Sequence, residues 1–398
     1  MAGWFTETID LGDGPIRSHG ESDGFVLKLD PYGNRLWSKV FGGQGPDRAL
    51  GVAVDYDFQI VVTGWFTDDV DFGNGPVKSA GGKDVFIAAF SPSGSPLWSQ
   101  GFGGEDDQFG NGVQVGGGGN IVVTGSFEGT IEFGGDLLET IDERDVFVVE
   151  LDGNGAPLWS RSFGGEGSQT GFAVAVDSGE DVIVTGEFEG KLDFGSIQLV
   201  SEGGKDVFVT KLDSYGTLMW TRRFGDAADQ SGLGVAVGAE GDVVVTGAFS
   251  GKIDFGSGAL ASKGGTDAFL CKLGAAGEGV LWSRGFGDAA NQSGLGVAID
   301  AKGNVAVTGV LEGTSDFGGG PLVSQGRSDV FVAEVDASGK HLWSERFGDV
   351  EGQVGYAVAI DENGGIVLAG GFSGNVQFGT EPLKSQGEQD IFVAKFGP

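Results

Sequence analysis

The sequence repeats itself at a fixed interval of 61 residues, with one step of 62. The clearest marker is a tryptophan preceded by Leu or Met, at Trp37, Trp98, Trp159, Trp220, Trp282 and Trp343. A second marker is an aspartate before an aromatic strand, at Asp23, Asp84, Asp145, Asp206, Asp267, Asp329 and Asp390. A third is an Asp-Phe-Gly-like triplet that begins at Asp10, Asp71, Glu132, Asp193, Asp254, Asp316 and Gln377. Three series in one register indicate a repeat protein, in which each unit buries its apolar face against its neighbours.

Each unit contains four short runs that are typical of β-strands. Representative copies, in order within the unit, are Leu50–Asp55, Ile121–Phe127, Asp206–Leu212 and Leu158–Phe163. These runs are β-branched or aromatic and are bounded by Gly, Asp, Asn and Ser. No window shows apolar residues at a spacing of 3.6, so we predict almost no helix.

The connectors between these strands are of two kinds. The first-to-second connector (300–304) and the third-to-fourth connector (213–216) are tight turns, with Gly where a residue of positive φ is needed. The other two, such as 224–233 and 250–266, are long. Because successive strands alternate in direction, both long connectors should lie at one end of each unit. Binding residues often sit on long loops of a rigid scaffold, so we expect any ligand at this long-loop end.

Four up-and-down strands in each of seven units, without helices, predict an all-β fold: a seven-bladed β-propeller of four-stranded blades. The first strand carries small residues such as Gly234 and Ala236 and should line a central channel, with the fourth strand at the outer edge. We predict a single propeller domain over 1–398. Its repeat units are 1–41, 42–102, 103–163, 164–224, 225–286, 287–347 and 348–398, of which the first and last are incomplete.

The predicted number of strands leaves the first and the last blade with one strand fewer than the others. The sequence supplies seven second and seven third strands but only six first and six fourth strands, which gives 26 strands instead of 28. Unpaired strand edges favour association with another chain. We expect a monomer whose ring closes imperfectly, and the alternative is a strand-exchanged oligomer. Since Met1 leads directly into repeat sequence with no signal peptide, we also expect a trimmed piece of a longer protein.

Composition narrows the range of partners. The 79 glycines are periodic and mark turns, while the formal net charge of −33 comes from 57 acidic against 24 basic residues. An acidic surface repels phosphate groups, so nucleic acid and anionic membrane surfaces are disfavoured as partners. No apolar run approaches the 18 residues that a membrane span needs. The single cysteine, Cys271, should be buried and inert.

Three segments between Gly296 and Asp349 resemble a known family. The strings GNVAVTG, SDVFVAEVD and ASGKHLWSERFGD are similar to the SBBP repeat of bacterial β-propellers, and the pattern covers essentially the whole chain. The resemblance implies a propeller fold in a secreted or cell-surface setting and supplies no catalytic residues. A weaker likeness to FG-GAP propellers brings no calcium site, because the turn DAKGN is too short and too poor in ligands.

Five glutamines are the candidate ligand-binding residues. Each lies six residues after the Phe of a Phe-Gly pair, in a long connector beside the first strand: Gln108, Gln169, Gln230, Gln292 and Gln353. A ring of amides at a channel mouth could bind a sugar or a peptide. The alternative is that each amide satisfies backbone groups of its own loop.

The remaining polar residues indicate no metal, cofactor or catalytic site. The repeated aspartates could form a ligand ring, but we favour carboxylates that accept backbone N–H groups in the turn before the third strand. Acidic loop residues such as Glu105, Asp107 and Asp226 match no calcium motif. His19 and His341 have no nucleophile or metal partner nearby in the sequence.

The repeat also gives no sign of an enzyme in the first strands. They read GVAVD, GVQVG, AVAVD, GVAVG, GVAID and AVAID, without the unique His, Arg, Tyr or Glu that a channel enzyme needs. We therefore predict a non-catalytic scaffold or binding module, outside the cytoplasm, with an unidentified protein or glycan ligand at the long-loop end. The alternatives are a lectin-like glycan-binding propeller and a hydrolase or lyase in the channel.

Overall fold

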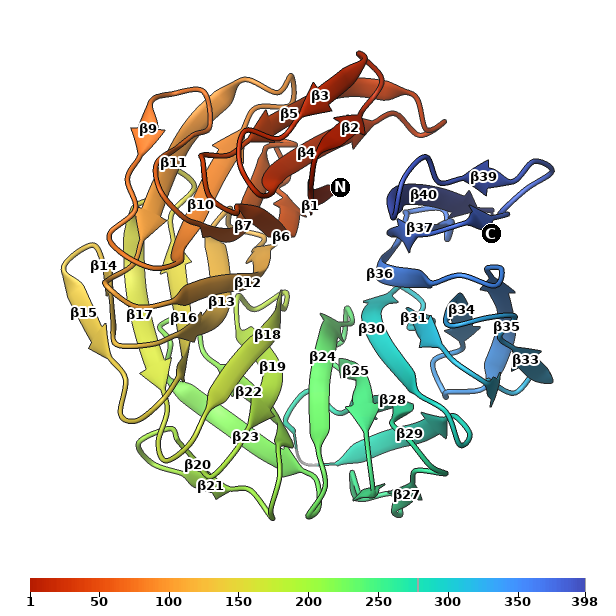
Figure 1. The fold of residues 1–398 in the computed structure, drawn as a ribbon. Helices are drawn as coiled ribbons and strands as arrows, with labels where there is room; N and C mark the ends of the chain where they lie inside the picture. The colour runs from red at the N-terminus through yellow and green to blue at the C-terminus, as the bar shows by residue number, and fades with distance from the viewer. Residues whose placement is uncertain (278, 398) are drawn as a thin grey trace. The chain divides into compact units, whose positions relative to one another are not determined.

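The computed structural model describes residues 1–277 and 279–397, which form small antiparallel sheets that follow the repeat (Figure 1). Five of these sheets have four strands and two have three, which gives the 26 strands that the sequence predicts. No residue in the described ranges is helical, and so none of them forms a helix that could cross a membrane. The fold is a seven-bladed β-propeller, as predicted.

In the five four-stranded blades the second and third strands form the middle of the sheet and are almost fully buried. In the first blade the second strand is an edge strand, and in the last blade the third strand is. The second strands, five of which carry a Val-Thr-Gly pattern, are β1 (Ala2–Phe5), β7 (Ile60–Phe66), β13 (Ile121–Phe127), β19 (Val182–Phe188), β25 (Val243–Phe249), β31 (Val305–Leu311) and β37 (Ile366–Phe372). The third strands are β4 (Asp23–Leu29), β10 (Asp84–Phe90), β16 (Asp145–Leu151), β22 (Asp206–Leu212), β28 (Asp267–Leu273), β34 (Asp329–Val335) and β40 (Asp390–Phe396).

The first and fourth strands form the two edges of the complete blades. The first strands are β6 (Arg48–Val54), β12 (Gln108–Val115), β18 (Gln169–Val176), β24 (Gln230–Val237), β30 (Gln292–Ile299) and β36 (Gln353–Ile360). The fourth strands are β5 (Arg35–Phe41), β11 (Pro96–Phe102), β17 (Pro157–Phe163), β23 (Leu218–Phe224), β29 (Val280–Phe286) and β35 (His341–Phe347).

A short hairpin that we did not predict lies in the connector between the second and third strands of every blade. It is formed by the Asp-Phe-Gly element and the residues that follow it. The seven pairs are β2 (Thr8–Asp10) with β3 (Pro15–Arg17), β8 (Val70–Asp71) with β9 (Pro76–Val77), β14 (Thr130–Phe133) with β15 (Asp136–Glu139), β20 (Lys191–Asp193) with β21 (Gln198–Val200), β26 (Lys252–Ile253) with β27 (Leu260–Ala261), β32 (Thr314–Asp316) with β33 (Pro321–Val323), and β38 (Asn375–Val376) with β39 (Leu383–Lys384).

Strand register confirms that the long connectors share one end of a blade. In the third blade, Gln108 of β12 pairs with Phe127 of β13, which in turn pairs with Asp145 of β16. At the opposite end, Val115 pairs with Ile121 and is joined to it by a tight turn. That turn uses glycine as predicted, since Gly119 has a φ of 85°.

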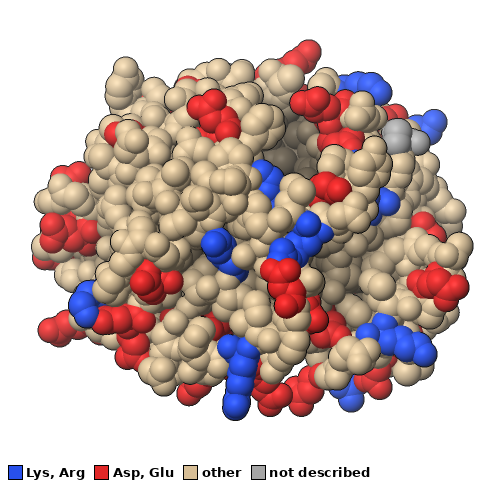
Figure 2. Space-filling model, turned by 90° about the horizontal axis from the view of Figure 1, so that it is seen from above, with Lys and Arg blue, Asp and Glu red and all other residues tan. Residues whose placement is uncertain are grey.

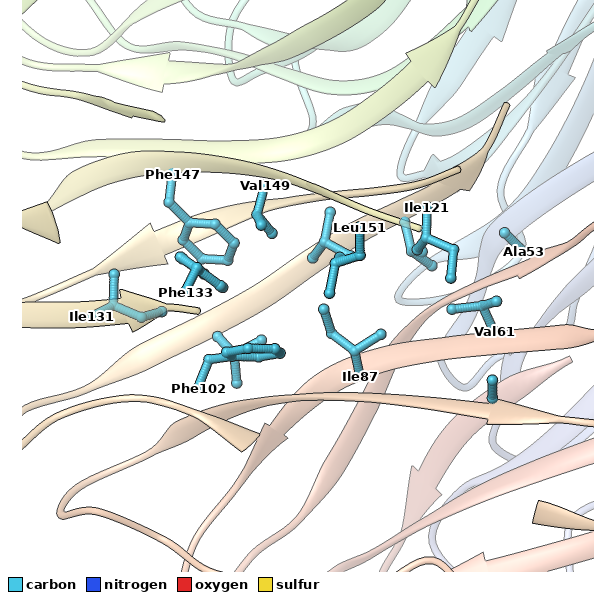
Figure 3. Packing of buried hydrophobic residues seen from close by; sticks show 14 of the residues in the cluster. Ala53, Val61, Ile87, Phe102, Ile121, Ile131, Phe133, Phe147, Val149 and Leu151 are labelled. Atoms are coloured by element: carbon cyan, nitrogen blue, oxygen red, sulfur yellow. The ribbon is translucent and has the colours of Figure 1, made fainter. Parts of the chain in front are cut away.

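Apolar side chains fill the space between consecutive blades (Figure 3). In the cluster shown there, Ile87 and Phe102 of the second blade meet Phe133 and Phe147 of the third. The hairpin residue Phe133 lies between the other two rings, with centroids 4.9 Å from Phe102 and 5.3 Å from Phe147. The Phe of the Asp-Phe-Gly element therefore acts as a wedge that joins neighbouring blades.

The chain divides into two compact units, and the division passes through the fourth blade. Unit 1 comprises Met1–Val184, Phe188–Val200 and Lys211–Met219, and unit 2 comprises Thr185–Glu187, Ser201–Thr210 and Trp220–Pro398. Within unit 1 the first strands β6, β12 and β18 lie side by side, and within unit 2 the same is true of β24, β30 and β36. Each unit thus repeats the same blade-to-blade packing.

The first and last blades have three strands each, with sheet orders β1-β4-β5 and β36-β37-β40. On β6, Val52 and Val54 are 38% and 55% exposed, whereas the equivalent Val113 and Val115 of β12 are 8% and 9% exposed. Ring closure and oligomeric state stay predictions. Cys271 is buried as expected, and burial raises the pKa of its thiol well above the usual range.

Candidate binding surface at the long-loop end

The five candidate glutamines are all buried at the first residue of their strands. The Gln230 amide shows the arrangement: its Nε2 donates to Asp226 Oδ1 at 2.9 Å and to the Ser250 carbonyl at 3.0 Å, and its Oε1 accepts the Asp226 N–H. Gln169 likewise donates to three backbone carbonyls, of Glu166, Glu189 and Lys191. Each glutamine therefore ties the loop before it to the hairpin connector of its own blade.

The burial and the hydrogen bonds of these glutamines affect whether they could contact a ligand. A buried amide that is already bonded to backbone groups offers no free donor to a sugar or peptide. Binding through Gln108, Gln169, Gln230, Gln292 or Gln353 stays a prediction that requires their loops to open. What the structure assigns to them is the loop-bonding alternative.

The repeated aspartates accept backbone N–H groups, as favoured from the sequence. Asp145 Oδ2 accepts the N–H of Ile141 at 3.1 Å, and the same contact four residues back recurs in other blades, for example at Asp329 with Gln325. The carboxylate also lies against the glycine that follows the fourth strand of its own blade, since a Cβ on Gly164 would collide with Asp145. The repeated aspartate and the glycine after the fourth strand thus pack against each other.

Burial changes the pKa values of carboxyl groups at this end of the blades. Burial raises the pKa of Asp145 to about 6, and burial likewise raises the pKa of Asp47, which takes the glutamine position in the second blade, to about 6. Burial also raises the pKa of Asp206 and Asp329, whose carboxylates pair with the guanidinium groups of Arg223 and Arg346. Most of these acids are too buried to form an open ligand ring.

The acidic loop residues also bond to the backbone. Asp226 accepts N–H groups from Ala228 and Lys252, and Asp288 accepts them from Ala290 and Thr314. Among the described residues no group of three or more His, Cys, Asp or Glu side chains could hold a metal ion. Figure 2 shows acidic side chains scattered over the face that it draws, with fewer basic ones among them.

The repeat is broken at two positions of this end, in the first three blades only. The residue before the last one of the second strand is Trp4 or Trp65 in blades 1 and 2, but in the later blades it is Ser126, Glu187, Ala248, Val310 or Gly371. The residue after the glutamine position is Arg48 or Phe109 in blades 2 and 3, but in the later blades it is Thr170, Ser231, Ser293 or Val354. Large aromatic and cationic side chains thus replace mostly small ones.

These residues contact one another in an aromatic–cation cluster within unit 1, formed by Trp4, Arg48, Trp65, Lys83, Phe109 and Arg144. The Arg48 guanidinium lies 3.9 Å from the Trp4 ring centroid and 5.3 Å from that of Trp65. Trp65 meets Phe109 edge to face at 6.1 Å, and Lys83 and Arg144 lie about the Phe109 ring at 5.0 and 5.1 Å. A cation that lies over an aromatic face is attracted by the quadrupole of the ring.

The three cations of the cluster differ in their partners. Lys83 Nζ pairs with Asp107 at 2.5 Å, and Arg144 pairs with Glu128. Arg48 has no ion-pair or hydrogen-bond partner in the described part of the chain, and its Nε is buried. Burial lowers the pKa of Arg48, because the charged form loses hydration. An arginine held by two indoles without a carboxylate is unusual in a chain with 57 acidic residues.

Sequence reasoning missed this cluster. The first strands from Gly51 onward show no break in the repeat, and the cluster lies outside these segments. The signal was present one residue before Phe5 and Phe66, where the aligned units differ most in side-chain volume. It becomes visible only when the units are aligned and read for differences.

The two histidines also need one correction. His341 does have a hydroxyl nearby in sequence, since its Nε2 lies 3.0 Å from Ser344 Oγ. His341 and Ser344 line an open hollow of about 510 Å³ together with Leu322 and Trp343. His19 Nδ1 contacts Asp23 at 2.9 Å beside a second hollow. Neither histidine belongs to the aromatic–cation cluster.

The fold and this surface define the chain as a repeat β-propeller with one differentiated sector. No known protein-family profile matches the sequence. An uncharacterised WD repeat-containing protein of Acanthamoeba polyphaga mimivirus is 23% identical over 441 residues, which covers 90% of this chain and 32% of the viral protein. Regulatory protein FlaEY of Caulobacter vibrioides is 28% identical over 167 residues, which covers 40% of this chain and 17% of that protein. The chain spans a third or less of the length of these curated relatives.

Similar solved structures have low sequence identity to this chain. A protein of unknown function from Bacteroides caccae has a TM-score of 0.41 at 10% identity, covering 81% of this chain and 93% of that one. A gluconolactonase from Xanthomonas campestris has a TM-score of 0.40 at 12% identity, covering 81% of this chain and 82% of that one. The WD40 domain of Neurospora crassa Pan2 has a TM-score of 0.36 at 13% identity, covering 80% of this chain and 85% of that one. At these scores the likenesses carry no argument about what this chain does.

Proposed function

We propose that this propeller is a non-catalytic binding scaffold whose ligand contacts the aromatic–cation cluster at the long-loop end of unit 1. The observation that carries the proposal is the break in the repeat. Selection for folding alone would favour the same side chains in every blade, and blades 4 to 7 fold without large aromatic residues at these positions. Exposed aromatic and arginine residues are also the types most often found at the centre of binding surfaces.

Two further considerations support the proposal. The viral relative is a WD repeat-containing protein, and WD repeats form β-propellers. The resemblance to SBBP repeats favours a place outside the cytoplasm, on the cell surface or in the medium. The ligand would be a protein or a glycan, with nucleic acid disfavoured by the net charge of −33.

A binding screen with matched variants tests the proposal. The wild-type chain is applied to a glycan array and to a peptide array, and each ligand found is tested again with Trp4→Ala. The control is Trp343→Ala, which removes the same ring from the sixth blade, outside the cluster. We expect Trp4→Ala to weaken binding at least tenfold while Trp343→Ala does not. A ligand that binds both variants like the wild type would place the site elsewhere.

The second candidate function is acyl transfer at the His341–Ser344 pair. The specific observation is their 3.0 Å contact beside an open hollow. We rank it second because Asp316, the acid that interacts electrostatically with His341, uses Oδ1 to accept the N–H groups of Gly318 and Gly320. Labelling by a fluorophosphonate probe that is lost in Ser344→Ala would support this function, and an unlabelled protein would exclude it.

A further inference from the structure

We propose that Arg48 and Trp4 together form a subsite for a carboxylate-bearing sugar, a hexuronic acid residue, which rests on the binding function proposed above. The inference concerns the ligand class and not only the location of the site. It follows from the state of the Arg48 guanidinium, from the exposure of Trp4 and from the charge of the whole chain.

The first step is that the Arg48 charge requires an anion that the chain does not provide. A partly buried guanidinium is normally compensated by a carboxylate, because burial without a partner costs free energy. Lys83 and Arg144, in the same cluster, have such partners in Asp107 and Glu128. Arg48 has none among the residues that the structure describes. The missing anion is therefore best supplied by a ligand.

The second step is that the contacts of Arg48 leave its donors available. Both neighbours of the guanidinium are ring faces, with centroids at 3.9 Å for Trp4 and 5.3 Å for Trp65. No carboxylate or carbonyl among the described residues accepts a hydrogen bond from the guanidinium, so its donors stay without a protein acceptor, and its Nε is buried. A planar carboxylate is the acceptor that matches two parallel guanidinium donors.

The third step concerns the rest of the ligand. Arg48 covers one face of Trp4, and 38% of that residue remains exposed, whereas Trp65 is only 6% exposed. An exposed indole beside a carboxylate-binding arginine suits a compact ring with an apolar face and one acidic group. A hexuronic acid has both features.

The fourth step excludes ligands of high charge. With a net charge of −33 the chain repels polyanions at long range, so a nucleic acid or a polyphosphate would lose more than one arginine could restore. A single carboxylate is repelled far less, and it is attracted locally. This favours one acidic sugar residue at the Arg48–Trp4 subsite within an otherwise neutral glycan.

Isothermal titration calorimetry with methyl β-D-glucuronide and methyl β-D-glucoside tests the ligand class directly. The two probes differ only in the carboxylate. We expect the glucuronide to bind the wild type at least tenfold more tightly than the glucoside, and Arg48→Gln to remove that preference. Arg48→Lys should also lose most of it, because an ammonium group cannot donate two parallel bonds. The matched control is Arg284→Gln, the same change of charge on the fourth strand of blade 5, which should bind like the wild type.

The outcomes separate the ligand class from the site. Equal binding of the two glycosides, or an unchanged preference in Arg48→Gln with a thermal unfolding curve like that of the wild type, would overturn the carboxylate proposal. If peptides with a free C-terminal carboxylate bind and their amidated forms and the glucuronide do not, the sugar class is wrong. If an array ligand without a carboxylate binds and is lost in Trp4→Ala, the binding function stands while the acidic-sugar inference fails.

Discussion

The indole N–H of Trp98 donates to the carbonyl of Gly153, at 3.1 Å across two neighbouring blades. The same bond, always 55 residues apart, joins Trp37 to Pro92, Trp159 to Ser214, Trp220 to Ala275 and Trp282 to Ala337. In each case the ring also lies against the turn glycine of the next blade, such as Gly155 beside Trp98. The tryptophans of the first five blades therefore bind to the third-to-fourth turn of the next blade.

This contact predicts a loss of stability in Trp282→Phe. Trp282 is 6% exposed, and phenylalanine keeps most of the ring contact but loses the bond to Ala337. We expect the free energy of unfolding to fall by about 1–2 kcal/mol, from the lost hydrogen bond and the smaller ring. Urea denaturation gives the value. Trp343→Phe is the control, because Trp343 is in the sixth blade and its indole donates to Glu334 of the same blade instead of to a turn of the next blade. Equal losses in both variants would show that the contact adds nothing.

The glutamines give the second prediction. Removing the Gln230 amide would leave the Asp226 N–H and the Ser250 carbonyl without their partner inside a buried loop. We expect Gln230→Ala to cost about 2–4 kcal/mol of unfolding free energy, since each buried polar group that loses its partner costs about 1–3 kcal/mol. Changing Gln169 as well should roughly double the loss, because the two sites lie in separate loops.

The exposed Gln198 supplies the control, and Gln198→Ala should change stability by less than about 0.5 kcal/mol. A double variant of Gln169 and Gln230 that unfolds like the wild type, yet fails to bind a ligand found on the arrays, would return these residues to the ligand-binding role.

Much of the fold could be predicted because its determinants are local and repeated. The predicted strands Ile121–Phe127 and Asp206–Leu212 have the bounds that the structure shows. Their alternation, the turn glycines and the interval of 61 residues all point to the same blade. The turn glycine Gly303, for instance, has a φ of 84°, as a tight connector of this kind requires.

The hairpins and the aromatic–cation cluster escaped prediction for different reasons. Strands such as Val70–Asp71 contain too few residues to show any alternation, and they form because Phe72 is held between blades by Phe41 and Phe86. The cluster is a departure from the repeat and draws its members from three blades. Averaging over units therefore hides it, and only contacts in space bring Trp4 next to Arg48.

The buried carboxylate of Asp145 gives a prediction of pH dependence. Its pKa is about 6 in the folded protein, above the usual value for an aspartate, because burial disfavours the charged form. The folded state therefore binds a proton that the unfolded state releases between about pH 4 and 6, so this group lowers stability as the pH rises through that range. Asp145→Asn removes the effect. Relative to the variant, the wild type should lose about 1–3 kcal/mol between pH 4.5 and 7.

Asp336→Asn is the matched control for this titration. The Ser338 hydroxyl and the N–H groups of Lys340 and Ser338 hold the pKa of Asp336 below its usual value. The ionised form therefore adds stability, which is gained as the pH rises through the acid range, so the difference between wild type and this variant should have the opposite sign. Urea midpoints at pH 4.5, 5.5, 6.5 and 7.5 give the Asp145 slope, and further midpoints at about pH 2.5 and 3.5 give the Asp336 slope, because the pKa of Asp336 lies below that of an ordinary aspartate. Parallel curves for the wild type and Asp145→Asn would contradict a raised pKa.

The last prediction concerns a buried ion pair at the tight-turn end. Lys211 Nζ lies 2.7 Å from Asp177 and 3.0 Å from Asp181, and the side chains of Lys211 and Asp177 are only 7% and 8% exposed. Lys211→Met keeps the side-chain length but leaves Asp177 buried without its cation. We expect a loss of about 3 kcal/mol in the free energy of unfolding, because an uncompensated buried charge costs more than the pair contributes.

Two further variants make this result specific to burial. Lys191→Met removes an exposed lysine that pairs with Glu166 at 2.9 Å, and it should leave stability nearly unchanged, because water screens an exposed ion pair. Adding Asp177→Asn to Lys211→Met removes the stranded charge and should restore part of the loss. If Lys191→Met and Lys211→Met are equally mild, the Lys211 pair is hydrated in solution and the blade does not depend on it. If the second substitution deepens the loss, the hydrogen bonds that Asp177 accepts from Gly179 and Asp181 outweigh its charge in stabilising the turn.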